Sequence, residues 1–183
     1  ASNGFTALDF ACTRGETTCA LRLLDHGADP RRVGPGLLSP LSIASIRGCA
    51  ATTELLLAHG AGMLPPAGLP PLVYACARGA LACAEAQMGS MWPREARAHA
   101  HNLAATALLA AAACGRGNVV QMLLARGASP DLAPCGTNGA HALFAATVED
   151  HADCAELLLR AGARVDTPTD DNTTALIAAS QAG

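Results

Sequence analysis

The stretch Leu55-Leu56-Leu57-Ala58-His59-Gly60-Ala61 decides the fold of this chain, because close variants of it return along the sequence at a nearly constant interval. The variants are Leu23-Leu24-Asp25-His26-Gly27-Ala28, Met122-Leu123-Leu124-Ala125-Arg126-Gly127-Ala128 and Leu157-Leu158-Leu159-Arg160-Ala161-Gly162-Ala163. Their closing glycines lie 33, 67 and 35 residues apart, and 67 is close to two intervals with one closure missing. A period near 33 residues predicts a stacked array of helical units.

A second repeated feature sets the frame of each unit. Alanine-rich stretches open at Thr6-Ala7-Leu8, Ser39-Pro40-Leu41, Pro70-Pro71-Leu72, Thr106-Ala107-Leu108, His141-Ala142-Leu143 and Thr174-Ala175-Leu176. Nine residues after five of these openings stands a glycine or its substitute: Gly15, Gly48, Gly79, Gly115 and Asp150. Thr or Ser suits a helix N-cap, Pro the first helical position, and Gly a left-handed C-cap. Each unit is therefore predicted to form a short helix, a turn, a second helix that bears the leucines, and a polar loop.

These units resemble ankyrin repeats, whose signature runs Thr-Pro-Leu-His-x-Ala-Ala, then Gly, then a leucine triplet before Gly-Ala-Asp. The first unit matches through Thr6-Ala7-Leu8-Asp9-Phe10-Ala11, Gly15, Leu23-Leu24 and Gly27-Ala28-Asp29. The resemblance covers essentially the whole chain and implies an all-α ankyrin-repeat solenoid of helix-turn-helix units with short hairpin loops. We expect one array over residues 1–183, with units at about 2–34, 35–65, 66–101, 102–136, 137–169 and a truncated 170–183. The half unit, which leaves Leu176 and Ile177 without a partner helix, suggests that the array is part of a longer polypeptide.

The third unit departs from the pattern. Its second helix, predicted from Ala80 to Met88, lacks the leucine triplet and the Gly-Ala closure, and Gly89-Ser90-Met91-Trp92-Pro93 interrupts it. We therefore expect an irregular junction between the third and fourth units, with Pro93 at the first position of an extra short helix. Trp92, the only tryptophan, either covers the core of the defective unit or acts as a docking anchor.

Composition excludes several classes of protein. The chain is 51% hydrophobic but only 3% aromatic, which suits thin helices packed through Ala, Leu, Val and Cys. No run of about 18 apolar residues predicts a membrane span, and no signal peptide opens the sequence. All twelve basic residues are arginine, and the net charge of −3 is uneven, with +3 on residues 1–130 and −6 on residues 131–183. This balance gives no general case for nucleic acid.

The eight cysteines fit the repeat frame better than a metal site or a disulfide framework. Cys19, Cys83 and Cys154 each lie thirteen residues after the opening of a unit, at a core position of the second helix. Cys12 and Cys76 each lie six residues after an opening, on the packed face of the first helix. Buried free cysteine behaves as a small hydrophobe, so we expect these thiols to be inaccessible. No Cys-x-x-Cys pair supports zinc. Cysteine spaced by the repeat points to a reducing, intracellular setting, cytoplasmic or nuclear.

No pattern indicates an enzyme. The serines lack a nucleophile elbow, the glycines mark turns and not a phosphate-binding loop, and the cluster Glu149-Asp150-His151-Ala152-Asp153 lacks the spacing of a calcium loop. His26 and His59 precede closing glycines and are interpreted as residues that favour the negative end of a helix dipole. We expect no catalytic residue, cofactor, metal or small-molecule substrate.

The resemblance implies that partners bind the concave side, which is formed by loop tips and first helices. The eighth residue after an opening belongs there, and it is Arg14, Arg47 and Arg78 in the first three units, then Cys114 and Glu149. The arginines would form a ladder, although this exposed position is also commonly charged in such repeats. Apolar residues near the same side are Phe5, Leu38, Leu69 and Ile46, each of which could instead pack against its own loop.

Together these features favour a non-catalytic protein–protein interaction module or adaptor that grips an extended acidic or amphipathic segment of a protein. Two alternatives remain open at this point. One is a structural subunit built permanently into a large assembly, and the other is a regulatory ankyrin segment of a larger enzyme or channel. For the interaction module, the candidate partner-binding residues are Phe5, Arg14, Leu38, Ile46, Arg47, Leu69, Arg78 and Trp92.

Overall fold

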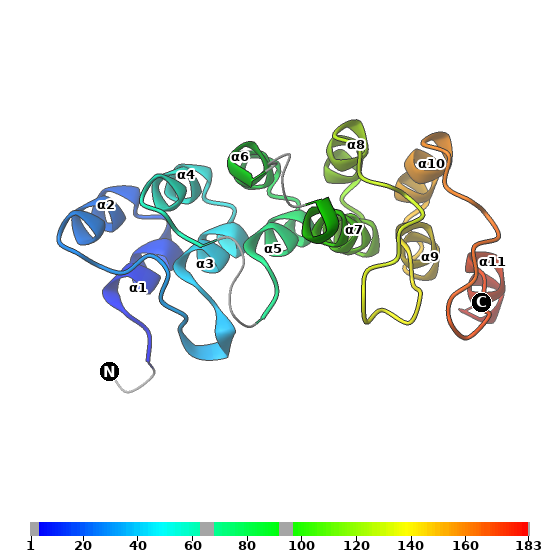
Figure 1. The fold of residues 1–183 in the computed structure, drawn as a ribbon, viewed down its shortest axis with the longest axis horizontal. Helices are drawn as coiled ribbons and strands as arrows, with labels where there is room; N and C mark the ends of the chain where they lie inside the picture. The colour runs from blue at the N-terminus through cyan, green and yellow to red at the C-terminus, as the bar shows by residue number, and fades with distance from the viewer. Residues whose placement is uncertain (1–3, 63–67, 92–96, 183) are drawn as a thin grey trace. The chain divides into compact units, whose positions relative to one another are not determined.

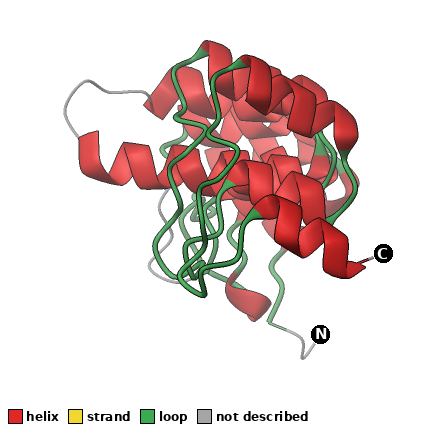
Figure 2. Ribbon diagram, turned by 90° about the vertical axis from the view of Figure 1, so that its right-hand side faces the viewer, coloured by secondary structure: helices red, strands yellow, loops and turns green. Residues whose placement is uncertain are grey.

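The computed structural model describes residues 4–62, 68–91 and 97–182, with the backbone alone at residues 90, 91, 97–101, 181 and 182. Within these ranges every regular element is a helix, as Figure 2 shows by its colours. Contacts group the chain into two compact blocks, an N-terminal block of residues 1–93 and a C-terminal block of residues 94–183.

The N-terminal block consists of three helix pairs, which we call the first, second and third repeats. Their helices are α1 (Ala7–Arg14) with α2 (Thr17–Asp25), α3 (Pro40–Arg47) with α4 (Ala50–Ala58), and α5 (Pro71–Arg78) with α6 (Leu81–Met91). A 3-10 turn, η1 (Pro35–Leu37), lies in the loop between the first two repeats. The first helices α1, α3 and α5 pack in one row and the second helices α2, α4 and α6 in another (Figure 1). Each repeat thus covers one face of the next.

The C-terminal block repeats this plan. Its fourth repeat is α7 (Arg97–Ala113) with α8 (Gly117–Ala125), its fifth is α9 (Ala142–Val148) with α10 (Ala152–Arg160), and its sixth is represented by α11 (Ala175–Ala182). α9 lies between α7 and α11, and α10 packs on α8. Leu176 and Ile177 on α11 are exposed.

Most of the predicted helix ends are confirmed. The Thr6 hydroxyl accepts a hydrogen bond from the Asp9 amide, and the Asp9 carboxylate accepts one from the Thr6 amide at 2.8 Å, which completes a capping box. The first helices of the N-terminal block end at left-handed glycines, Gly15, Gly48 and Gly79. Asp150 takes the same left-handed backbone conformation, with φ of 55°, where the fifth repeat lacks the glycine.

The predicted helix start at Thr106 is wrong. Thr106 lies inside α7, and its hydroxyl donates to the Asn102 carbonyl oxygen at 2.7 Å. The helix begins at Arg97 because residues 97–113 are rich in alanine and leucine and contain no glycine or proline to stop it. It therefore runs across the boundary predicted between residues 101 and 102. Trp92 and Pro93 lie outside the described residues, so the expectations for them stay predictions.

One core position shows how the third repeat departs from the others. The second helices of the second, fourth and fifth repeats place Leu56, Leu123 and Leu158 at this position, and all three are fully buried. The third repeat places Gln87 there, also fully buried. The Gln87 amide nitrogen donates to the Ser45 hydroxyl at 2.8 Å, whereas its carbonyl oxygen has no hydrogen-bond partner among the described residues. The missing leucine triplet therefore places a polar side chain in the core.

The cysteine prediction is confirmed at four positions and wrong at a fifth. Cys12, Cys76, Cys83 and Cys154 are buried, and burial raises the pKa of the Cys12 and Cys76 thiols to about 12. Cys19 is exposed, because no helix pair among the described residues covers its side of α2. All eight cysteines are free.

Candidate protein-binding surface

The three arginines predicted to form a ladder occupy equivalent places in the N-terminal block. Arg14, Arg47 and Arg78 are the last residues of α1, α3 and α5, and each precedes a left-handed glycine with φ between 70° and 73°. Because these three helices lie side by side, the arginines follow one another along the same edge of the block. We call them the arginine row.

The arginine row is exposed and only lightly paired. Arg14 approaches Glu16 at 4.0 Å, and the side chains are 75% and 49% exposed, so this ion pair contributes little to stability. Among the described residues no carboxylate forms an ion pair with Arg47 or Arg78. Each guanidinium also lies at the negative end of a helix dipole, which stabilises the helix whether or not a partner binds.

The apolar candidates divide into packed and exposed residues. Phe5 and Leu38 are half-buried and pack against the core of the first two repeats, so they have a structural role whether or not a partner binds. Ile46 is half-buried beside Arg47. Leu69 is 48% exposed at a loop end.

Leu37 is an exposed apolar residue that the sequence prediction missed. It is 50% exposed, and its φ of 61° is rare for a leucine. A Cβ atom on Gly68 would come within 3.2 Å of the Leu37 Cβ, so the two neighbouring loops touch here. The sequence Gly34-Pro35-Gly36 in front of Leu37 was the available signal, since it predicts a tight turn that pushes the following side chain outward.

The C-terminal block has a different surface at the equivalent places. Cys114 and Glu149 stand where the N-terminal block has arginine, and both are exposed. Between the loops at 137–140 and 169–173 a hollow of about 540 Å³ opens onto α9 and α11. Phe144 and Val148 line it, together with Asp171. This hollow was not predicted, because the residue that follows the first leucine of a repeat is polar or aliphatic in the other repeats and gives no sign that Phe144 faces a hollow.

His141 shows how the C-terminal block holds its loops in place. The fully buried ring accepts a hydrogen bond from the Phe144 amide through Nδ1, at 3.3 Å, and caps α9 in place of the usual Thr or Ser. Its Nε2 lies 3.1 Å from the Thr167 carbonyl oxygen and must donate to it, because a carbonyl only accepts. The ring is therefore a structural link. His26 and His59 similarly donate through Nδ1 to carbonyl oxygens four residues earlier, at 2.8 and 2.9 Å, as expected at helix ends.

The described residues contain neither a cluster suited to a metal ion nor a helix that could span a membrane. In the part of the chain that the structure describes, no three His, Cys, Asp or Glu side chains are placed to hold a metal ion. No helix among the described residues is long and apolar enough to cross a membrane.

Two family models match the chain. The model described as "Ankyrin repeats (3 copies)" matches residues 108–183, and the model described as "Ankyrin repeat" matches residues 3–34. Together they cover more than half of the chain.

Curated relatives and solved structures agree with these matches. "Ankyrin repeat and SOCS box protein 16" of Mus musculus is 40% identical over 81 residues, which is 39% of this chain and 18% of that protein. "Ankyrin repeat and SOCS box protein 2" of Homo sapiens is 43% identical over 58 residues, 32% of this chain and 9% of that protein. The chain therefore spans less than a fifth of either relative. The crystal structure of the ankyrin repeat domain of Bcl-3 superposes with a TM-score of 0.79 and 26% identity, over 98% of this chain and 81% of that one.

Proposed function

Because the chain belongs to the ankyrin-repeat family, we propose that its N-terminal block holds an extended acidic or amphipathic segment of a partner protein along the arginine row. Ankyrin repeats are generally protein–protein interaction modules. The observation that carries the finer proposal is the arginine row itself. Three exposed guanidinium groups end three adjacent helices, and Arg47 and Arg78 are left without a carboxylate among the described residues.

The positive charge of the arginine row favours a partner segment that is rich in carboxylates. A guanidinium group binds a carboxylate through two parallel hydrogen bonds, and repeated cations attract an acidic segment before contact. Leu37 and Leu69 project from loop ends of the same block and would supply apolar contacts to an amphipathic segment. Aromatic, aliphatic and arginine side chains in one patch are typical of protein interfaces.

The role in the cell is proposed from the same features. The names of the matched relatives join ankyrin repeats to a SOCS box, and this chain spans less than a fifth of them. A similar arrangement here would make the array the non-catalytic, partner-binding part of an adaptor. Four buried and free thiols suit a reducing, intracellular compartment, cytoplasmic or nuclear. The proposal involves no nucleic acid, membrane insertion, cofactor or small-molecule substrate.

Site-specific photo-crosslinking tests which face binds. A photo-reactive amino acid replaces Ile46, beside the arginine row, or Glu54, which is exposed on the second helix α4 of the same repeat. Proteins captured by the native polypeptide should crosslink through position 46 and not through position 54. Crosslinking through position 54 alone, or equally through both positions, would contradict the proposed surface.

A further inference from the structure

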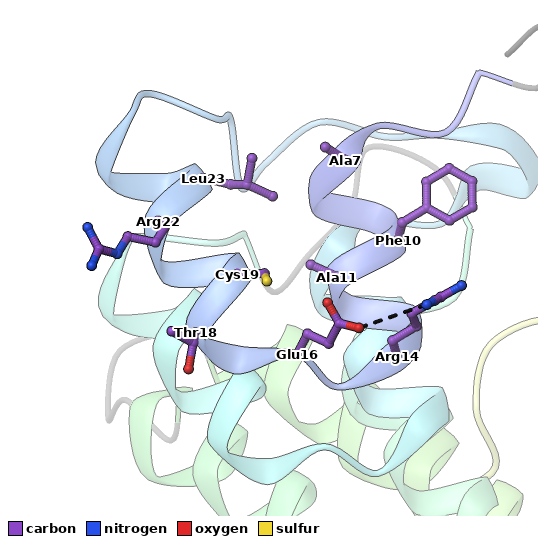
Figure 3. A pocket seen from close by; sticks show the side chains of 9 residues that line it. All are labelled: Ala7, Phe10, Ala11, Arg14, Glu16, Thr18, Cys19, Arg22 and Leu23. Carbon is purple, nitrogen blue, oxygen red and sulfur yellow. Dashed lines mark ion pairs between the residues drawn. The ribbon is translucent and has the colours of Figure 1, made fainter.

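The first repeat has an open apolar face that is separate from the arginine row. Figure 3 shows the side chains of α1 and α2 that line a hollow of about 650 Å³ on this face. Phe10, Ala11, Cys19 and Leu23 make its floor apolar, and Phe10 is 48% exposed. The charged residues of the lining are Arg14, which pairs with Glu16, and Arg22 on α2.

The positions of Cys19 and Leu23 are buried in the second, third and fifth repeats, which have a neighbour on this side, and the position of Phe10 is buried or half-buried there. In the second repeat, Ile43 takes the place of Phe10 and is 6% exposed, while Thr52 and Leu56 take the places of Cys19 and Leu23 and are fully buried. They are covered because α1 packs on α3 and α2 packs on α4.

The fifth repeat gives the same result in the other block. There Cys154 and Leu158 stand in the places of Cys19 and Leu23, and both are buried next to the fourth repeat, whose helices α7 and α8 pack on α9 and α10. The open face of the first repeat is thus the side on which a preceding helix pair packs.

The chemistry of this face is that of an interior surface. Repeats that end an array carry polar side chains on the outward side, because that side meets water. Here the corresponding positions hold phenylalanine, alanine, cysteine and leucine. A phenylalanine and a leucine side by side on a helix pair are stabilised when another apolar surface removes them from water.

The backbone just before α1 follows the course of a loop that joins two repeats. Gly4 is left-handed with φ of 70°, two residues before the N-cap, as are Leu37 and Gly139 before α3 and α9, with φ of 61° and 73°. Arg32 in the next loop donates to the Gly4 carbonyl oxygen at 3.1 Å. Consecutive loops touch in the same way at Asp170, whose amide donates to the Asn138 carbonyl oxygen at 2.9 Å.

We propose that the open face of the first repeat is the packing surface for a further helix pair of the same polypeptide, stacked on α1 and α2 as these stack on α3 and α4. The matched relatives are more than five times longer than the region they share with this chain, which leaves ample length for such a pair.

Alkylation of Cys19 in the full-length polypeptide tests the proposal directly. With the face covered, Cys19 should react at least 100-fold more slowly than the exposed Cys135, at a rate close to that of the buried Cys154 and independent of protein concentration. Because Glu16 raises the pKa of the Cys19 thiol through a hydrogen bond, the same measurement is made on Glu16→Gln. Protection should persist in that variant. Cys19 reacting as fast as Cys135 in either protein, or losing protection on dilution as a contact between two copies would, overturns the proposal.

A pair of variants provides a second readout that needs no thiol. Phe10→Asp should raise hydrogen exchange at least tenfold in α1, because it places a charge inside the stacking surface. Leu69→Asp introduces the same charge at a side chain with the same exposed fraction and should leave exchange in α1 unchanged. Equal behaviour of the two variants would overturn the proposal. Neither measurement involves the binding partner, so the inference can fail without affecting the proposed function.

Discussion

The two blocks of this chain share one frame of helix pairs but differ at positions that the frame leaves free. At the ends of the first helices, the N-terminal block has Arg14, Arg47 and Arg78, while the C-terminal block has Cys114 and Glu149. In the core, the N-terminal block buries Gln87 where the C-terminal block buries Leu123 and Leu158. The comparison teaches that the fold tolerates different residues at the exposed ends of the first helices and even one polar residue, Gln87, in place of a core leucine, and that these substitutions give each block its own surface and its own stability.

The largest effect is expected from making the C-terminal core resemble the N-terminal one. Leu158→Gln buries an amide in an apolar site and should lower the free energy of unfolding by about 3–5 kcal/mol. Its neighbour Leu159 is 44% exposed, so Leu159→Gln should change that free energy by less than about 0.5 kcal/mol. Urea unfolding followed by circular dichroism measures both variants, and equal losses would mean that the leucine register is wrong.

The next largest effect is an alkaline loss of stability that comes mainly from the N-terminal block. Burial raises the pKa of Cys12 and Cys76 from 9.0 to about 12, so between these values the unfolded chain binds fewer protons than the folded one. The stability contributed by the neutral thiols is therefore complete below pH 9 and decreases as the pH rises above it. From pH 8 to pH 10 the two thiols together should cost about 3 kcal/mol.

Urea unfolding at pH 8 and pH 10 checks this prediction, and the chain is well suited to it because it contains no lysine and one tyrosine. The double variant Cys12→Ala/Cys76→Ala should lose much less stability over this range than the wild type. Replacing the exposed Cys114 and Cys135 by alanine provides the control, which should keep the wild-type pH dependence. A double variant with an unchanged pH dependence would show that these thiols are not the cause.

A smaller, stabilising effect is expected when the N-terminal core is made to resemble the C-terminal one. Gln87→Leu removes a buried carbonyl oxygen that has no partner among the described residues and restores the leucine found in other repeats. The Ser45 hydroxyl keeps its bond to the Leu41 carbonyl oxygen at 2.7 Å. The free energy of unfolding should rise by about 1–2 kcal/mol in urea unfolding. Gln121→Leu, at an exposed position of α8, should have little effect, and a destabilised Gln87→Leu protein would refute this account of the third repeat.

The smallest effect concerns the turn before the first helices. Leu37 has a left-handed backbone conformation that is unfavourable for leucine, whereas the equivalent residue of the C-terminal block is glycine, Gly139. Leu37→Gly should therefore raise the free energy of unfolding by about 0.5 kcal/mol, after the entropy cost of glycine is subtracted. The opposite exchange, Gly139→Ala, would bring a Cβ within 2.8 Å of the Asp170 amide nitrogen and should destabilise. Thermal unfolding compares the two variants. A destabilised Leu37→Gly protein would indicate that the Leu37 side chain makes stabilising contacts.

The helix ends of each repeat could be predicted from the sequence where a residue type has a single structural role. Thr6, Ser39 and the glycines after α1, α3 and α5 mark helix ends, and the structure places them there. Thr106 misled because a threonine inside an alanine-rich run can donate to the carbonyl four residues earlier as well as cap a helix. The pattern of residues 97–113 does not distinguish these two uses.

The candidate surface was harder to predict, because exposure depends on neighbours that lie far away in the sequence. Cys19, Cys83 and Cys154 share one register, yet only Cys19 is exposed, since burial at that position requires a preceding helix pair. Leu37 and Phe144 were missed for a related reason. The exposure of Leu37 follows from its left-handed loop conformation, and the half-buried Phe144 on α9 faces a hollow that two neighbouring loops leave open, neither of which apolar periodicity encodes.

Charge reversal on the arginine row tests the central claim most directly. The protein with Arg14→Glu, Arg47→Glu and Arg78→Glu is compared with one carrying Arg22→Glu, Arg126→Glu and Arg164→Glu, which has the same net charge but an intact row. Calorimetric titration with the captured partner should show binding about 100-fold weaker for the first variant and nearly unchanged for the second. If the row variant binds as tightly as the wild type, or the two variants weaken binding equally, the arginine row does not hold the partner.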